Sequence, residues 1–173
     1  MKADKLKQQF LEVYKANSDA VFRYCLFRIS SEEAAIDMTQ DVFMKFWDSL
    51  ISGKEIRNER AFIFMIARNL VIDFYRKKKS VSLDAILDEN EDSSFMASEG
   101  SLKEDIEMSS EARFVLDKIS ELDPKDQQIV YLRYVEGLQP KDIAEVLGIS
   151  PNAVSVRVIR GIDKLRHITG YGG

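Results

Sequence analysis

Cations and carboxylates placed along predicted helices are the residues of this 173-residue chain best suited to chemistry. Tyr75 directly precedes four consecutive cations, Arg76, Lys77, Lys78 and Lys79. Cations beside an aromatic ring suit phosphate contact combined with base stacking, which single-stranded nucleic acid favours. A basic helix end could instead complement the helix dipole, but four cations exceed what that requires. The run therefore favours nucleic-acid binding.

A second polar group recurs at helical spacing within residues 32–50, a stretch that is otherwise apolar. Its members are Asp37, Gln40, Asp41, Lys45 and Asp48. Ile36, Phe43, Trp47 and Leu50 are expected to form an apolar ridge on the same helix. The polar stripe is either a plain solvated face or a docking face for a partner that presents arginines.

Residues 138–166 predict two short helices joined by a tight turn. Pro140 suits the first position of a helix that ends near Leu147, and Gly148 suits the left-handed position that follows it. Ser150 can cap the next helix, whose inward face begins with Val154. This arrangement predicts a helix-turn-helix, in which the second helix enters the major groove of DNA. A plain helical hairpin within a bundle is the alternative.

Catalysis has few candidate residues. The single histidine, His167, lies near the end of the sequence, and the single cysteine, Cys25, has no histidine nearby. No glycine-rich phosphate loop is present, and the carboxylates fall on solvated faces, so we expect no catalytic site, metal or cofactor. One cysteine excludes an internal disulfide and fits a reducing cytoplasm, with Cys25 in the core.

The composition, 45% hydrophobic and 31% charged, predicts a globular protein, and frequent helical periodicity predicts an all-α fold. We expect helices over 5–29, with a possible break at 17–19, then over 32–50, 60–79, 109–122 and 124–135, and then the helix-turn-helix. A polar loop, 51–59, precedes the third helix. No signal-peptide pattern opens the chain, and no apolar run is long enough to insert in a membrane.

The net charge of −4 is unevenly distributed. Residues 1–79 carry a net charge of +4, residues 80–110 carry −8, and residues 111–173 are neutral. The central segment is rich in serine and acid and lacks periodicity, which is typical of a flexible linker. We therefore expect two small helical domains, 1–79 and 109–173, joined by an acidic flexible linker, 80–108.

Three segments resemble the extracytoplasmic-function sigma factors, group 4 of the sigma-70 family of bacterial RNA polymerase. DMTQDVFMKFW is similar to the part of sigma region 2 that docks on the polymerase clamp. AFIFMIARNLVIDFYRKKK resembles the part that opens DNA and contacts the minus-10 element. ELDPKDQQIVYLRYVEGLQPKDIAEVLGISPNAVSVRVIRGIDKLR resembles region 4, which contacts the minus-35 element. The order of the three segments, with a linker between, matches the family.

The resemblance implies roles for individual residues. Those implied to bind core polymerase are Asp37, Gln40, Asp41 and Lys45. Those implied to contact minus-10 DNA are Arg68, Asn69, Asp73, Tyr75, Arg76 and Lys77. Those implied to contact minus-35 DNA are Pro151, Asn152, Ser155, Val156, Arg157 and Arg160. The loop from about Ser52 to Arg60 corresponds to the family's base-capturing specificity loop.

The implied partners are core RNA polymerase, through the clamp helices of its beta-prime subunit and the flap of its beta subunit, promoter DNA, and an anti-sigma factor. The chain departs from the family pattern at Ser155 and Val156, which predicts fewer phosphate contacts. Gly161 stands where alanine is usual and costs about 1 kcal/mol of helix stability unless close packing requires it. A stand-alone helix-turn-helix regulator is the alternative function; it would bind duplex DNA by itself, usually as a dimer.

Overall fold

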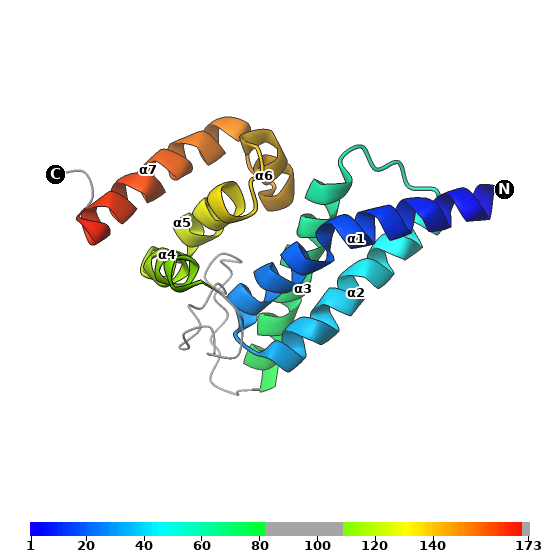
Figure 1. The fold of residues 1–173 in the computed structure, drawn as a ribbon, viewed down its shortest axis with the longest axis horizontal. Helices are drawn as coiled ribbons and strands as arrows, with labels where there is room; N and C mark the ends of the chain where they lie inside the picture. Colours follow the sequence, from blue (N-terminus) through cyan, green and yellow to red (C-terminus); the bar gives the residue numbers. More distant parts are fainter. Residues whose placement is uncertain (82–108, 171–173) are drawn as a thin grey trace. The chain divides into compact units, whose positions relative to one another are not determined.

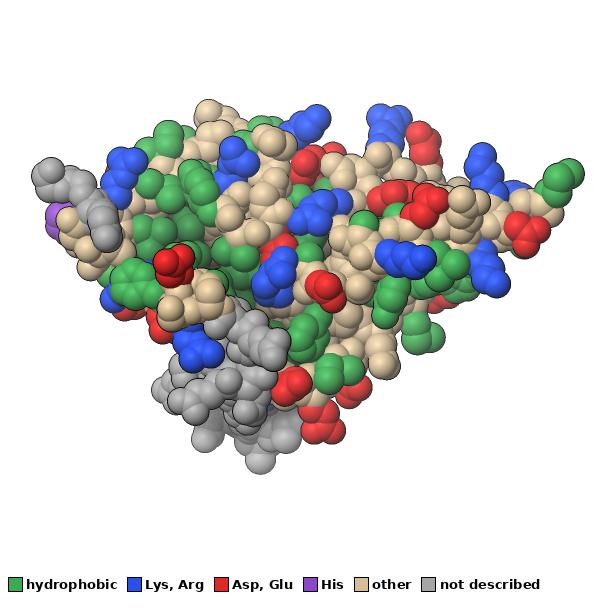
Figure 2. Space-filling model, viewed as in Figure 1, with side chains coloured by type: hydrophobic (Ala, Val, Ile, Leu, Met, Phe, Trp, Pro, Cys, Tyr) green, Lys and Arg blue, Asp and Glu red, His purple; other side chains and the backbone are tan. Residues whose placement is uncertain are grey.

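The computed structural model describes residues 1–81 and 109–170, and these form helices joined by turns and one longer loop (Figure 1). No strand occurs in these two ranges, so the predicted all-α class is confirmed. Most of the predicted acidic linker, residues 82–108, lies outside the described residues. The chain divides into two compact units, and cationic and acidic side chains are interspersed on the surface that Figure 2 shows.

Three helices build the first unit: α1 (Lys2–Ile29), α2 (Glu32–Ile51) and α3 (Glu59–Val81). A tight turn joins α1 to α2, because Ser30 adopts a left-handed conformation, with φ of 52°, and Ser31 caps α2. The Ser31 hydroxyl accepts a hydrogen bond from the Ala34 amide at 3.3 Å. The two helices consequently run antiparallel, and α3 packs against both (Figure 1).

Helix α1 is continuous, so the predicted break at residues 17–19 is wrong. Asn17 is buried, but both ends of its amide are hydrogen-bonded without disrupting the helix. Its Nδ2 donates to the Val13 carbonyl at 2.9 Å, and its Oδ1 accepts from Arg60 Nη1 at 2.9 Å. A polar residue in an apolar stripe is tolerated here because a residue on α3 satisfies it.

The core of the first unit combines aliphatic and aromatic side chains from all three helices. Among its fully buried residues are Val21, Tyr24, Val42, Phe46, Ile63, Phe64 and Val71. Phe10 lies between the rings of Phe46 and Trp47, with centroid distances of 6.1 and 5.4 Å. The predicted apolar ridge of α2 is correct at Phe43 and Leu50 but wrong at Ile36, which is exposed.

The second unit contains α4 (Ser110–Ser120), α5 (Pro124–Val130), α6 (Pro140–Leu147) and α7 (Pro151–Thr169). A π-helical turn (Tyr131–Val135) extends α5. Tyr131 is buried in this turn, whereas Tyr134 is 58% exposed. The prediction that Tyr134 lies inside is therefore wrong.

Gly161 lies where α7 crosses α5. A Cβ atom at this position would come within 2.6 Å of Val130 Cγ2, which is closer than real Cβ contacts allow. Close packing therefore requires glycine here, and the helix-propensity cost is offset by the approach of the two helices.

Candidate nucleic-acid and protein interfaces

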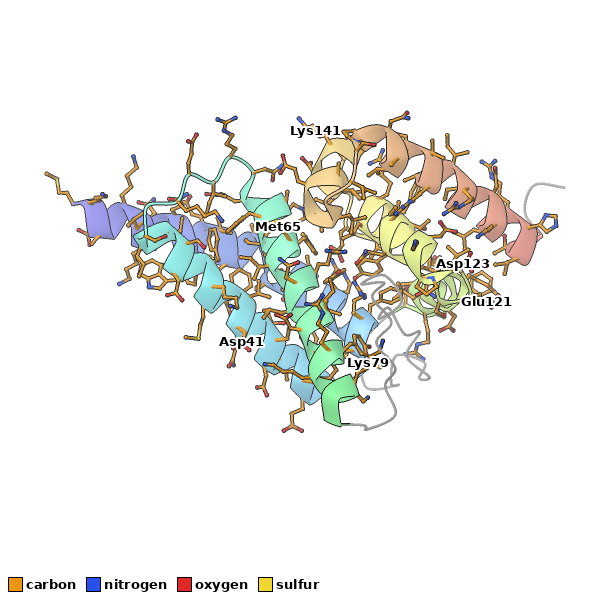
Figure 3. All side chains as sticks on the ribbon, turned by 180° about the vertical axis from the view of Figure 1, so that it is seen from behind. Asp41, Met65, Lys79, Glu121, Asp123 and Lys141 are labelled. Atoms are coloured by element: carbon orange, nitrogen blue, oxygen red, sulfur yellow. The ribbon has the colours of Figure 1, made fainter. Side chains whose placement is uncertain are left out.

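The polar stripe of α2 faces solvent. Asp37, Gln40, Asp41, Lys45 and Asp48 are all exposed. Met38, Val42, Phe46 and Leu50 on the opposite side are buried against the other two helices. Asp41 lies near the middle of α2 (Figure 3). The helix thus presents a mostly acidic surface from a rigid, well-packed position.

Helix α3 presents most of the residues implied to contact minus-10 DNA on one exposed face. Asn69, Asp73, Arg76 and Lys77 are exposed and follow helical spacing, while Arg68 is half-buried at the edge of this face. Lys79 follows in the last turns of the helix (Figure 3). The face carries cations that suit phosphates and an amide that can hydrogen-bond to a base edge.

Tyr75 does not belong to this exposed face. Its side chain is only 8% exposed, and its hydroxyl donates a hydrogen bond to the backbone carbonyl of Arg28 on α1. Burial raises the pKa of the Tyr75 hydroxyl, which therefore stays a donor at neutral pH. The expectation that this ring stacks on a base is wrong. The helical spacing of the sequence could have indicated that Tyr75 is buried, because it follows buried Ala67 and Val71 at intervals of four.

Sequence reasoning missed Arg28, a buried cation at the end of α1. Its Nη1 donates to the Tyr24 hydroxyl at 2.7 Å, and the guanidinium carbon lies 5.6 Å from the centre of the Tyr24 ring. Burial lowers the pKa of Arg28 from its ordinary value. Tyr75 and Arg68 of α3 also affect this pKa, so the buried cation lies near α3. The sequence feature that could have indicated this buried cation is the position of Arg28 within the otherwise apolar run 24–29.

The loop between α2 and α3 is exposed but anchored at both ends. Gly53 takes a left-handed conformation, with φ of 78°, and the Asn58 side chain accepts from the Ala61 amide at 3.0 Å. Lys54 Nζ lies 4.8 Å from the centre of the Phe62 ring. Because Arg60 bonds to buried Asn17, the start of α3 is fixed to α1. The loop therefore projects from a rigid base.

The helix-turn-helix has the predicted local geometry. Its first helix is Pro140–Leu147, and Gly148 follows in the left-handed region with φ of 67°. The Ser150 hydroxyl caps α7 by accepting from the Ala153 amide at 3.1 Å. Ile143, Ala144 and Val154 are buried between the two helices. Helix α7 is thereby held with its opposite face open to solvent.

The residues implied to contact minus-35 DNA lie mostly on that open face. Pro151, Asn152, Ser155 and Val156 are exposed, whereas Arg157 is half-buried. Arg160 is exposed but is engaged within the protein. Its Nε and Nη2 atoms donate to Asp126 Oδ1 at 3.2 and 2.8 Å. A role for Arg160 toward DNA is thus limited by this pairing.

Asp126, which sequence reasoning missed, is a fully buried carboxylate at the centre of an ion cluster. Lys164 Nζ donates to Asp126 Oδ2 at 2.9 Å and to Asp123 Oδ2 at 2.6 Å. Burial alone would raise the pKa of Asp126, but the hydrogen bonds from Arg160 and Lys164 more than compensate and lower it. In the sequence, Asp126 resembled an ordinary acidic residue in the first turn of a helix, where it would interact with the helix dipole.

The residues considered for catalysis do not converge on a site. Cys25 is buried, and burial raises the pKa of its thiol to about 12, so it is a core residue as expected. His167 lies exposed in the last turn of α7. Within residues 1–81 and 109–170 no group of three His, Cys, Asp or Glu side chains could hold a metal ion. No helix in these ranges is both long and apolar enough to cross a membrane.

Two family descriptions match the two units in turn. Sigma-70 region 2 matches residues 13–81, and Sigma-70 region 4 matches residues 115–165. SigZ, an RNA polymerase sigma factor of Bacillus subtilis, is 31% identical over 147 residues, which cover 84% of this chain and 78% of SigZ. The extracytoplasmic-function factor SigW of the same organism is 28% identical, with 91% and 87% covered. BldN of Streptomyces coelicolor is also 28% identical; the match covers 92% of this chain but only 60% of BldN.

Two solved structures share the fold. The sigma factor RpoE in complex with the anti-sigma factor NepR from Bartonella quintana superposes with a TM-score of 0.72 at 20% identity, covering 98% of this chain and 99% of that one. CnrH in complex with the cytosolic domain of CnrY gives a TM-score of 0.67 at 22% identity, covering 99% and 96%. With the two family matches in the order that the sequence predicts, the chain belongs to the sigma-70 family and is an RNA polymerase sigma factor of the extracytoplasmic-function group.

Proposed function

We propose that the chain directs core RNA polymerase to a bipartite promoter by using three separate exposed faces. The α2 stripe binds the polymerase, the α3 face and its preceding loop engage the minus-10 element, and α7 engages the minus-35 element. The observation that carries the proposal is the α2 stripe, a polar surface maintained on a helix whose other side is packed into the core. In a stand-alone regulator the same stripe would be a plain solvated face.

The partner of the α2 stripe is the clamp of the beta-prime subunit. Asp37, Gln40 and Asp41 offer two carboxylates and an amide along one helix face, with Lys45 at its edge. Arginines on a facing helix would bind these carboxylates through paired, charge-assisted hydrogen bonds. The second unit would contact the flap of the beta subunit, which would set the spacing of the two DNA-binding faces.

The α3 face contacts DNA at the minus-10 element. Arg76 and Lys77 supply phosphate contacts, and Asn69 can hydrogen-bond to a base edge. The loop from residue 52 to 60 would capture a base flipped out of the stack. Unstacking the nucleotide base costs a few kcal/mol. Because both ends of the loop are anchored, the loop itself loses little conformational entropy when it binds.

The organisation of the chain follows from these roles. We propose the division into domains 1–79 and 109–173 with an acidic linker, 80–108, between them; α3 itself continues to Val81. The chain would act in the cytoplasm, where core polymerase and the chromosome are. The polymerase performs the chemistry of transcription, and we assign no catalytic step to this chain. An anti-sigma factor would inhibit it by covering the same exposed faces.

Reconstitution tests the proposal directly. The full chain is mixed with core polymerase that lacks sigma, and the complex is measured by gel filtration and by transcription from a library of promoter fragments. Asp41→Arg should weaken assembly by more than about tenfold, because it would place like charges opposite each other. Asp19→Arg, which changes an exposed acid on α1, serves as the matched control and should assemble normally.

Arg76→Ala separates assembly from DNA engagement. It should leave the complex with core polymerase intact and reduce initiation, since it removes a phosphate contact from the α3 face. A chain that never joins core polymerase but binds duplex DNA tightly by itself would refute the proposal and favour the stand-alone regulator.

A further inference from the structure

Two exposed apolar side chains lie on the outward face of α7. Val156 is 56% exposed and Ile159 is 64% exposed, whereas Val154 and Gly161 of the same helix are buried. Asn152, Val156 and Ile159 follow each other at intervals of four and three, so they form one line along the helix. Val154, on the opposite side, is fully buried against α6 and α5. This outward line is the part of α7 that a DNA groove would meet first.

Three cations of α7, Arg157, Arg160 and Lys164, lie on one side of this line and not in it. Arg160 is directed toward α5 by Asp126, and Arg157 is half-buried beside it. The line itself is therefore apolar apart from Asn152, which suits contact with base edges in the major groove better than contact with phosphates. Among the groups that bases present there, the 5-methyl group of thymine is the apolar one.

The spacing along the helix also fits stacked bases. Val156 and Ile159 are three residues apart, which corresponds to a rise of about 4.5 Å. Successive base pairs are separated by about 3.4 Å, so the two side chains would meet neighbouring base pairs. Both side chains are β-branched and stiff, so little rotamer freedom is lost on contact.

We propose that Val156 and Ile159 determine minus-35 specificity by contacting thymine methyl groups on neighbouring base pairs. This inference rests on the proposed function, because it assumes that α7 enters the major groove of the minus-35 element. Asn152, next in the line, can pair with an adenine edge, which would extend the preference for A·T pairs.

The experiment uses holoenzyme reconstituted from core polymerase and the full chain. Promoter duplexes are first selected from a library randomised across the upstream element. The selected duplex is then synthesised with thymine or with uracil at that element, because uracil lacks only the methyl group. Affinity should fall about fourfold for each contacted methyl group removed, the factor expected for one buried group of that size.

Variants assign the effect to the two side chains. Val156→Ala and Ile159→Ala should each reduce the thymine-over-uracil ratio, and the double variant should bring it to about one. Alanine is the best helix former and both sites are exposed, so folding is not threatened. Ile168→Ala, an exposed apolar residue in the last turns of the same helix, is the matched control and should keep the full ratio.

The outcomes separate this inference from the proposed function. Failure to assemble with core polymerase would overturn both. Normal assembly and sequence selection with a thymine-over-uracil ratio of one in the unchanged protein would overturn the inference alone. The inference would also fall if the selected element carried no thymine, or if the double variant kept the ratio.

Discussion

Asp126→Asn would test whether the buried ion cluster fixes α7 to α5. The substitution keeps the size of the side chain but removes the charge that Arg160 and Lys164 neutralise. A hydrogen bond to a charged group contributes about 1 kcal/mol more than a neutral one. Asp126 accepts three such bonds, but both cations are partly exposed and can be rehydrated. We therefore expect the free energy of unfolding of the second unit to fall by about 2 kcal/mol.

The lowered pKa of Asp126 also predicts how the stability difference between the two proteins changes with pH. Because the pKa of Asp126 is lowered in the folded state, its contribution is complete above the ordinary aspartate pKa of about 4. The contribution is lost as the pH falls through the lowered folded-state pKa. The stability difference between the native chain and Asp126→Asn should therefore be constant near neutral pH and shrink progressively below about pH 4.

The assay must report on the second unit alone, since two units can unfold separately. Amide hydrogen exchange in α5 and α7 provides that readout, while the fluorescence of Trp47 monitors the first unit and should not change. Asp123→Asn is the matched control, because Asp123 is an exposed member of the same cluster. Unchanged exchange in Asp126→Asn, or an equal effect of Asp123→Asn, would refute the reasoning.

Three further predictions concern single contacts. Gly161→Ala should destabilise the second unit by about 1–3 kcal/mol through overpacking, and Val130→Ala should partly restore stability in urea unfolding. A neutral effect of Gly161→Ala would show that the crossing is looser than described. Tyr75→Phe should cost about 1 kcal/mol in urea unfolding by removing the bond to the Arg28 carbonyl; unchanged stability would show that this bond does not hold α3 to α1. Cys25 should react with a thiol reagent only after unfolding, because it is buried and its pKa is about 12; rapid labelling of the native chain would contradict this.

Local signals predicted the helix-turn-helix to the residue. Pro140, Gly148 and Ser150 act within one or two turns of the chain, so the helix ends could be inferred without knowing the tertiary structure. The exposed stripe of α2 was equally predictable, since charged residues at helical spacing opposite an apolar face must lie outside.

The features that sequence reasoning missed depend on residues far apart in the chain. The Tyr75 hydroxyl bonds to a carbonyl 47 positions earlier, and Arg160 pairs with a carboxylate 34 positions earlier. No local pattern specifies such a partner. The π-helical turn at Tyr131–Val135 was likewise missed: Tyr134 is exposed there, although the sequence pattern predicted it inside the helix bundle.

The Asp126 cluster should also limit how strongly the second unit binds DNA by itself. Two of the cations of α7, Arg160 and Lys164, are already neutralised inside the protein. The second unit should therefore release few counterions on DNA and have low intrinsic affinity. Occupancy of a promoter then depends on avidity, in which attachment of one face raises the effective concentration of the other. Such a chain would bind tightly only where both elements occur at the right separation and polymerase joins them, which keeps it from being sequestered on isolated half-matches along the chromosome.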